Sequence, residues 1–101
     1  MDNVLRMIGL AKKAGKVSTG EFLCERSMKA GESVLLVIAC DISASSEKQM
    51  VNSCKYYGVD YIKYSDKEQL GRYTGGGVRA VVSINDSGFA AAIKEKYSAK
   101  Q

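Results

Sequence analysis

The sequence predicts an α/β protein, a three-layer α/β/α sandwich around a small mixed sheet. Segments with helical periodicity alternate with apolar strands along the whole chain. Two of these strands, residues 33–40 and 79–84, are almost continuously apolar, which is typical of strands covered by helices on both faces. The 101 residues contain no proline and no low-complexity segment, so we expect one domain over residues 1–101.

Periodicity and terminal residues predict three helices in the first half of the chain. Val4, Ile8 and Ala11 fall on one face of the first helix, and Ser18 with Glu21 has the spacing of a capping box that would open the second. Glycines end the three helices, at Gly15, Gly31 and Gly58. The predicted elements of this half are helix 3–14, a short strand or extended link at 16–18, helix 19–30, strand 33–40 and helix 43–57.

The second half predicts two more strands and two more helices. Residues 59–64 alternate as a strand does, and Ser65 with Glu68 has a second capping-box spacing that would open a short helix ending near Tyr73. After the strand at 79–84, the last helix is expected to place Phe89, Ala90 and Ile93 inward.

The residue types present argue against catalysis and against a metal or cofactor. The chain has no histidine, the commonest general base and metal ligand. Asp41 and Asp86 each end an apolar strand, where paired carboxylates could hold a metal, but the position equally suits capping of the following helix, which we favour. The cysteines have neither disulfide nor zinc spacing, so we expect buried free thiols at Cys24, Cys40 and Cys54.

Charge and hydropathy limit the partners. There are 15 Lys and Arg against 11 Asp and Glu, and the net charge of +4 permits an anionic partner without requiring one. The longest apolar run, residues 34–40, is far too short to span a bilayer, and the N-terminus lacks a signal-peptide layout. We therefore expect a cytoplasmic protein that does not engage membranes.

Cationic side chains gather around the first helix boundary. Lys12, Lys13 and Lys16 precede the predicted helix start near Ser18, where unpaired backbone N–H groups favour a phosphate. The alternative is that these lysines are ordinary solvated helix caps.

A run of three glycines forms the second feature with binding potential. Residues 75–77 let a backbone approach a ligand closely, and Arg72 and Arg79 bracket them while Tyr73 offers a ring for stacking. No Gly-Lys-Ser/Thr follows, so a nucleotide-binding P-loop is not matched. A flexible connection between a helix and a strand is the other interpretation.

Short motifs spread over nearly the whole chain resemble one known family. The first of these motifs is Leu-Ala-x-Lys-Ala-Gly-Lys over residues 10–16, and the last is Asp-x-Gly-Phe-Ala over residues 86–90. The full set is Gly9-Leu10-Ala11, Ala14-Gly15-Lys16, Gly20, residues 34–41, Leu70-Gly71, Ile84-Asn85-Asp86 and Gly88-Phe89-Ala90. Together they resemble the ribosomal-protein family typified by the archaeal L-seven-Ae and eukaryotic L-thirty-e proteins, most closely its bacterial YlxQ-like branch. The resemblance implies an α/β/α sandwich that binds RNA, in many members at a kink-turn, a sharp bend built on sheared G·A pairs.

The resemblance also implies which residues would contact RNA. In kink-turn readers, the helix after the glycine that matches Gly20 opens with an Asn and a Glu, and a Lys follows. Here Phe22, Leu23 and Arg26 hold these positions, so the basic residue is kept and the Asn-Glu pair is absent. Phe22 would then serve either as core packing or as a stacking platform. The predicted RNA-contacting residues are Lys13, Lys16, Thr19, Gly20, Glu21, Phe22, Arg26, Gly75, Gly76, Gly77, Val78 and Arg79.

Three functions remain open from the sequence. The leading one is a non-enzymatic RNA-binding protein of ribosomal type that clamps a bent, structured RNA, for which ribosomal RNA is one candidate and DNA is not expected. The second is a protein-interaction module that keeps the fold after RNA recognition has weakened. The third, a small nucleotide-binding enzyme, rests on the glycine run alone.

Overall fold

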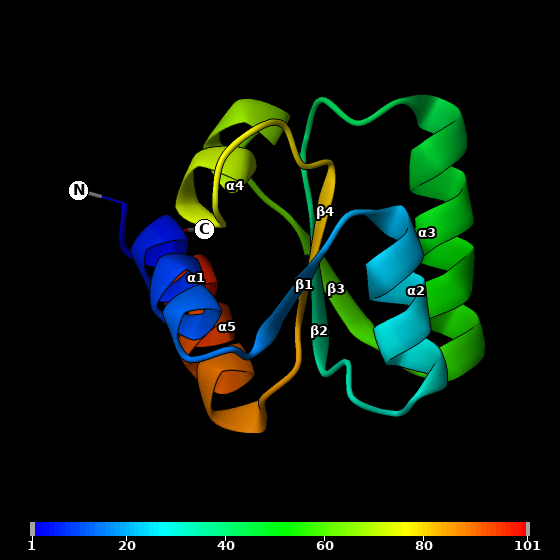
Figure 1. The fold of residues 1–101 in the computed structure, drawn as a ribbon, viewed down its shortest axis with the longest axis horizontal. Helices are drawn as coiled ribbons and strands as arrows, with labels where there is room; N and C mark the ends of the chain where they lie inside the picture. Colours follow the sequence, from blue (N-terminus) through cyan, green and yellow to red (C-terminus); the bar gives the residue numbers. More distant parts are fainter. Residues whose placement is uncertain (1, 101) are drawn as a thin grey trace.

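A computed structural model describes residues 2–100, within which five helices alternate with four strands. The elements are α1 (Asn3–Lys13), β1 (Val17–Thr19), α2 (Glu21–Lys29), β2 (Leu35–Ile38), α3 (Ala44–Tyr57), β3 (Asp60–Lys63), α4 (Lys67–Tyr73), β4 (Val81–Ile84) and α5 (Ser87–Ala99). Helices α1, α4 and α5 cover one face of the sheet and α2 and α3 cover the other (Figure 1). The predicted α/β/α sandwich is confirmed. None of these helices is long and apolar enough to cross a membrane.

The sheet is mixed, with the strand order β1-β4-β2-β3. Strand β4 pairs antiparallel with both β1 and β2, and β2 pairs parallel with β3. All residues of β2 and β4 are buried, as expected for the two strands that helices cover on both sides. The strand predicted at 33–40 is therefore real but shorter at both ends.

Alternate residues of β2 belong to two separate hydrophobic cores, because successive side chains of a strand point to opposite faces of the sheet. Leu35 and Val37 join the core under α1, α4 and α5, whereas Leu36 and Ile38 join the core under α2 and α3. The sheet thus divides the apolar interior, and each helical layer is anchored independently.

Both predicted capping boxes are wrong. Ser18 lies inside β1 opposite Ser83, and the N-cap of α2 is Gly20, two residues later. Strand pairing with β4 uses the backbone that a cap at Ser18 would need. At the fourth helix Asp66 Oδ1 accepts from Gln69 N at 2.8 Å, so the cap is one residue beyond Ser65.

The two aspartates that end apolar strands both satisfy helix N-termini, but only one caps the helix that follows it. Asp86 Oδ2 accepts from Phe89 N at 2.9 Å in the first turn of α5. Asp41 Oδ1 accepts at 2.9 Å from the backbone N–H of Lys67, the first residue of α4. The helix that follows Asp41 in the sequence, α3, is capped by Ser43 instead. Within residues 2–100, no group of three or more His, Cys, Asp or Glu side chains could hold a metal ion.

The three cysteines are free thiols, but the prediction that all are buried is wrong for Cys40. Cys40 is exposed because it follows the end of β2, where the chain leaves the sheet. Burial raises the pKa of Cys24 to about 12 and that of Cys54 to about 11. These two thiols therefore behave as small apolar core residues.

A hydrogen bond between distant residues fixes the start of α1. Tyr64 Oη donates to Asp2 Oδ2 at 2.6 Å, while Asp2 Oδ1 accepts from Leu5 N at 2.9 Å and caps the helix. Partial burial acts to raise the pKa of Asp2, but the hydrogen bonds from Tyr64 and Leu5 outweigh it and lower the pKa. Burial and the bond to Asp2 raise the pKa of Tyr64 to about 12.

We predict that Tyr64→Phe lowers the free energy of unfolding by about 1 kcal/mol at neutral pH, because one hydrogen bond to a charged group is lost. Since the folded-state pKa of Asp2 lies below its usual value of 3.8, this contribution is present above that value and disappears as pH falls through the folded pKa. Urea unfolding at neutral and at strongly acidic pH measures both effects. Tyr56→Phe is the control, because Tyr56 is 82% exposed. A Tyr64→Phe defect that is equally large in acid would contradict the assignment.

Candidate nucleic-acid interface

The pairing of β1 with β4 brings two segments far apart in the sequence to one end of the sheet. Thr19 lies opposite Val82 in the ladder, and Gly20 N donates to Val81 O at 3.1 Å just beyond it. The start of α2, which follows Gly20, therefore lies next to the end of the glycine loop at residues 74–79, which precedes β4. These are the two segments in which most predicted RNA-contacting residues occur.

Helix α2 begins with exposed apolar side chains. Gly20 adopts φ 85° and supplies no side-chain cap, so the first backbone N–H groups of α2 have no capping side chain. Phe22 is 78% exposed and Leu23 is 44% exposed. Core packing is therefore excluded as the role of Phe22, and its ring is available to a partner.

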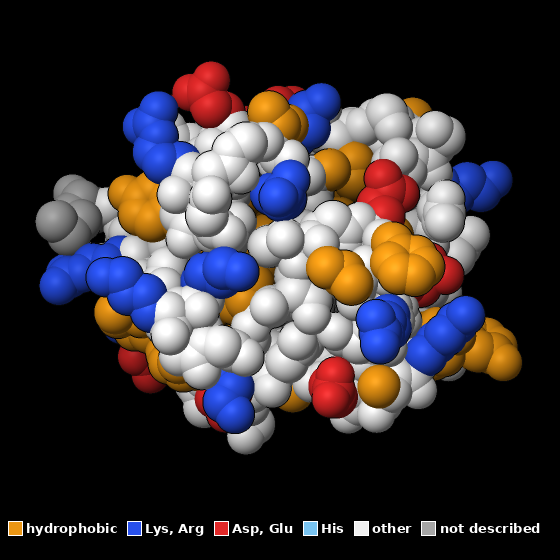
Figure 2. Space-filling model, in the orientation of Figure 1, with side chains coloured by type: hydrophobic (Ala, Val, Ile, Leu, Met, Phe, Trp, Pro, Cys, Tyr) orange, Lys and Arg blue, Asp and Glu red, His pale blue; other side chains and the backbone are white. Residues whose placement is uncertain are grey.

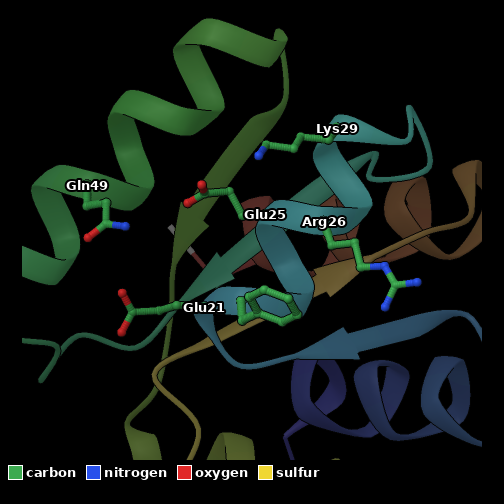
Figure 3. A pocket seen from close by; sticks show the side chains of 6 residues that line it. Glu21, Glu25, Arg26, Lys29 and Gln49 are labelled. Atoms are coloured by element: carbon green, nitrogen blue, oxygen red, sulfur yellow. The ribbon is translucent and has the colours of Figure 1, made fainter.

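The acidic side chains of α2 lie on a different side of the helix from Arg26. Glu21 Oε2 accepts from Ser46 Oγ at 3.4 Å, and Glu25 Oε2 accepts from Ser53 Oγ at 3.3 Å, so both carboxylates turn toward α3. Figure 3 shows Arg26 extending in the opposite direction, over β1. The side of α2 that faces β1 therefore carries the cation of Arg26, while Glu21, Glu25 and Arg26 line one shared pocket.

The glycine loop is held against α4 at several points. Gly75, Gly76 and Gly77 all have positive φ, which only glycine adopts easily. Gly76 N donates to Gly71 O at 2.6 Å, and a Cβ at Gly71 would lie 1.9 Å from Gly77 O. Buried Thr74 donates from Oγ1 to Leu70 O at 2.6 Å. The loop thus has a defined shape that depends on the missing side chain at Gly71.

The last two residues of the loop differ in exposure. Val78 is 60% exposed, whereas Arg79 is half-buried. Arg79 N donates to Lys67 O at 3.0 Å, and its Nη1 donates to Val78 O at 3.2 Å. Its Nε is buried and has no hydrogen-bond partner among residues 2–100. The guanidinium therefore lies folded back against its own loop.

The predicted lysines lie at other positions. Lys16 is at the opposite end of β1 from Gly20, where its carbonyl accepts from Asn85 N at 2.8 Å. Four residues of extended chain place the two about 13 Å apart along the strand. Lys13 lies in the last turn of α1. The structure therefore groups Thr19, Gly20 and Phe22 with the glycine loop and spreads the cations around them.

Sequence analysis did not predict a partly buried network of polar side chains under α2. Ser18 Oγ lies 2.7 Å from Ser27 Oγ and accepts from Asn85 Nδ2 at 2.9 Å. Ser83 Oγ lies 2.7 Å from both Ser33 Oγ and Asn85 Oδ1. The network ties α2 and the segment after it to β1 and β4. Isolated serines carry no sequence signal, because only the fold brings them together.

A family model described as the ribosomal protein L7Ae/L30e/S12e/Gadd45 family matches residues 2–94. The chain belongs to this family. The "RNA-binding protein YlxQ" of Bacillus subtilis is 36% identical over 84 residues, which are 83% of this chain and 84% of that protein. YlxQ of Enterococcus faecium is 31% identical over 91 residues, 90% of this chain and 87% of that protein. The resemblance to the YlxQ branch is thus confirmed.

A solved structure supports the same fold. The Giardia lamblia 15.5kD RNA binding protein matches with a TM-score of 0.77 at 20% sequence identity, over 96% of this chain and 83% of that chain. At this identity the likeness concerns the architecture alone.

We predict that Gly71→Ala lowers the free energy of unfolding by about 1–3 kcal/mol, because the added Cβ would collide with the backbone of Gly77. Urea unfolding measures this change in free energy. Faster hydrogen exchange at the Gly76 amide would show that its hydrogen bond to Gly71 O is lost and that the loop has moved away from α4. Gly9→Ala is the matched control, since its Cβ would meet only ordinary contacts at 3.5 Å. Equal effects of the two substitutions would show that the close approach at Gly71 is unimportant.

Proposed function

We propose that this chain is a non-enzymatic RNA-binding protein that takes a bent, structured RNA of the kink-turn type between residues 16–26 and 74–79. The observation that carries the proposal is the juxtaposition, across the β1–β4 pair, of an uncapped helix start with an exposed Phe22 and a glycine loop with an exposed Val78. Membership of the L7Ae family and the likeness to two YlxQ proteins named for RNA binding support it.

The backbone of the RNA is held by amides and cations. The N–H groups at the start of α2 and those of a loop with three positive-φ glycines suit phosphate oxygens. Arg26 lies over β1 on the side of α2 from which the carboxylates are turned away (Figure 3). These contacts position the RNA without reading its sequence.

Recognition of the bend relies on apolar surface. Phe22 stands where kink-turn readers have an amide side chain, so hydrogen bonding to sheared G·A pairs is replaced by stacking on an exposed ring. Val78 adds a second exposed apolar side chain from the facing loop. Unpaired or extruded bases at a bend are the groups that such surfaces bind.

We predict that Lys16→Ala, Arg26→Ala and Arg79→Ala each weaken binding to a kink-turn RNA and reduce the slope of log K against log salt by about 0.7–0.9 per lost phosphate contact. An electrophoretic shift assay at several salt concentrations measures this. Lys55→Ala on α3 and Lys96→Ala on α5 are controls of equal charge. Loss of binding in the controls, with none in the three test variants, would place the RNA elsewhere, and no RNA binding by the wild type would favour the interaction module.

We predict that Phe22→Ala leaves the free energy of unfolding within about 0.5 kcal/mol of the wild type, because the ring is exposed. The same change should cost about 1–3 kcal/mol of RNA-binding free energy through lost stacking. Tyr56→Ala removes an equally exposed aromatic ring from α3 and should leave RNA affinity unchanged. A destabilised Phe22→Ala protein with normal affinity would refute the stacking role.

A further inference from the structure

A second cationic surface lies outside the proposed clamp, in the groove between α1 and α4. The groove encloses about 500 Å³. Its lining includes Arg6, Lys12 and Lys13 from α1, Arg72 and Tyr73 from α4, and Gly75 from the loop that follows. In Figure 2 the blue side chains lie across the part of the surface formed by α1 and α4, and red ones lie at its rim.

The groove concentrates positive charge. Among residues 2–100, no carboxylate lines it. Glu68 approaches Arg72 to 3.6 Å but is 76% exposed, so their interaction is weak. Lys12, Lys13 and Arg72 all lie in the last turns of helices, where the helix dipole favours positively charged side chains. The result is a preformed surface for an anion.

The groove continues directly from the proposed RNA clamp. Gly75 belongs to both surfaces, and the Lys12 side chain lies along the loop, with its Cε 3.9 Å from where a Cβ of Gly75 would be. An RNA seated on the glycine loop therefore enters the α1–α4 groove if it extends beyond the bend.

The lining favours the phosphates of a double helix over unpaired bases. Tyr73 is half-buried and packs against the core, and its ring lies close to Gly9, so only part of the ring is open to a stacking base. Single-stranded RNA needs such platforms, whereas the backbone of a duplex needs only spaced cations.

We propose that the α1–α4 groove binds the phosphate backbone of one double-helical arm as it leaves the bend. This inference rests on the proposed RNA-binding function and extends it, because it makes affinity depend on the length of the arm as well as on the bend.

The test compares two synthetic RNAs that share the same bulge and tandem G·A pairs. One has flanking arms of about 5 base pairs, and the other has arms of about 12, which exceed the 33 Å long axis of the protein at roughly 3 Å per base pair. The test variant is Lys12→Gln with Arg72→Gln, and the charge-matched control is Lys55→Gln with Lys96→Gln. Urea unfolding verifies that both double variants are folded.

We expect the Lys12/Arg72 double variant to bind the long-armed RNA about tenfold more weakly than the wild type, with a salt slope reduced by about two contacts. Its affinity for the short-armed RNA should equal that of the wild type, and the control should match the wild type on both. Equal losses on both RNAs, or no loss on either, would overturn the groove proposal while leaving the clamp intact. Failure of the wild type to bind either RNA would instead refute the proposed function itself.

Discussion

Gly20 N–H donates to the carbonyl oxygen of Val81 at 3.1 Å and extends the antiparallel ladder between β1 and β4 by one further bond. With only three residues in β1, this contact and the ladder before it fix where α2 begins. Because β4 is the strand that the glycine loop enters, the same pairing fixes the loop relative to α2. Both halves of the proposed clamp therefore depend on one short edge strand, which adjoins the apolar sheet centre formed by β4 and β2.

The partly buried hydrogen-bond network under α2 strengthens the attachment of the short edge strand β1. Strand β1 pairs with β4 over only three residues, so backbone pairing stabilises it little. Helix α2 is also weakly anchored, because only three of its residues are buried, Cys24, Ser27 and Met28. The network joining Ser18, Ser27 and Asn85 adds directional contacts between the strand, the helix and the end of β4. Buried polar groups are favourable only when they find partners, so such a network restricts α2 to one position on the sheet. A purely apolar contact would allow the helix to slide.

The fold was predictable because its main signals are local. Continuous apolar runs gave the central strands, and helical periodicity with glycine stops gave the helix order. The errors occurred where tertiary contacts outweigh local preferences. Ser18 has cap spacing but pairs as a strand residue, and Asp41 satisfies an N–H of α4 that is 26 residues away. Local patterns identified both segments of the proposed clamp, as the lysines before Ser18 and the glycine run at 75–77, but only the family resemblance implied that they lie side by side. The close approach of Gly77 to Gly71, and the separation of carboxylates from Arg26 on α2, could not be predicted, because neither is encoded in the spacing of residues along the sequence.

The modest net charge of +4 understates how positive the proposed RNA face is, because most acidic side chains are engaged elsewhere. Asp2, Asp66 and Asp86 cap helices. Glu21 and Glu25 turn to α3, and Glu47 and Asp60 pair with lysines near β3 and α5. Since exposed charges act over about 8–10 Å at physiological salt, an approaching phosphate responds to the local arrangement rather than to the sum. These acidic residues thus contribute to helix capping and to ion pairs within the fold, whereas lysines such as Lys12, Lys13 and Lys16 remain available to an anionic partner.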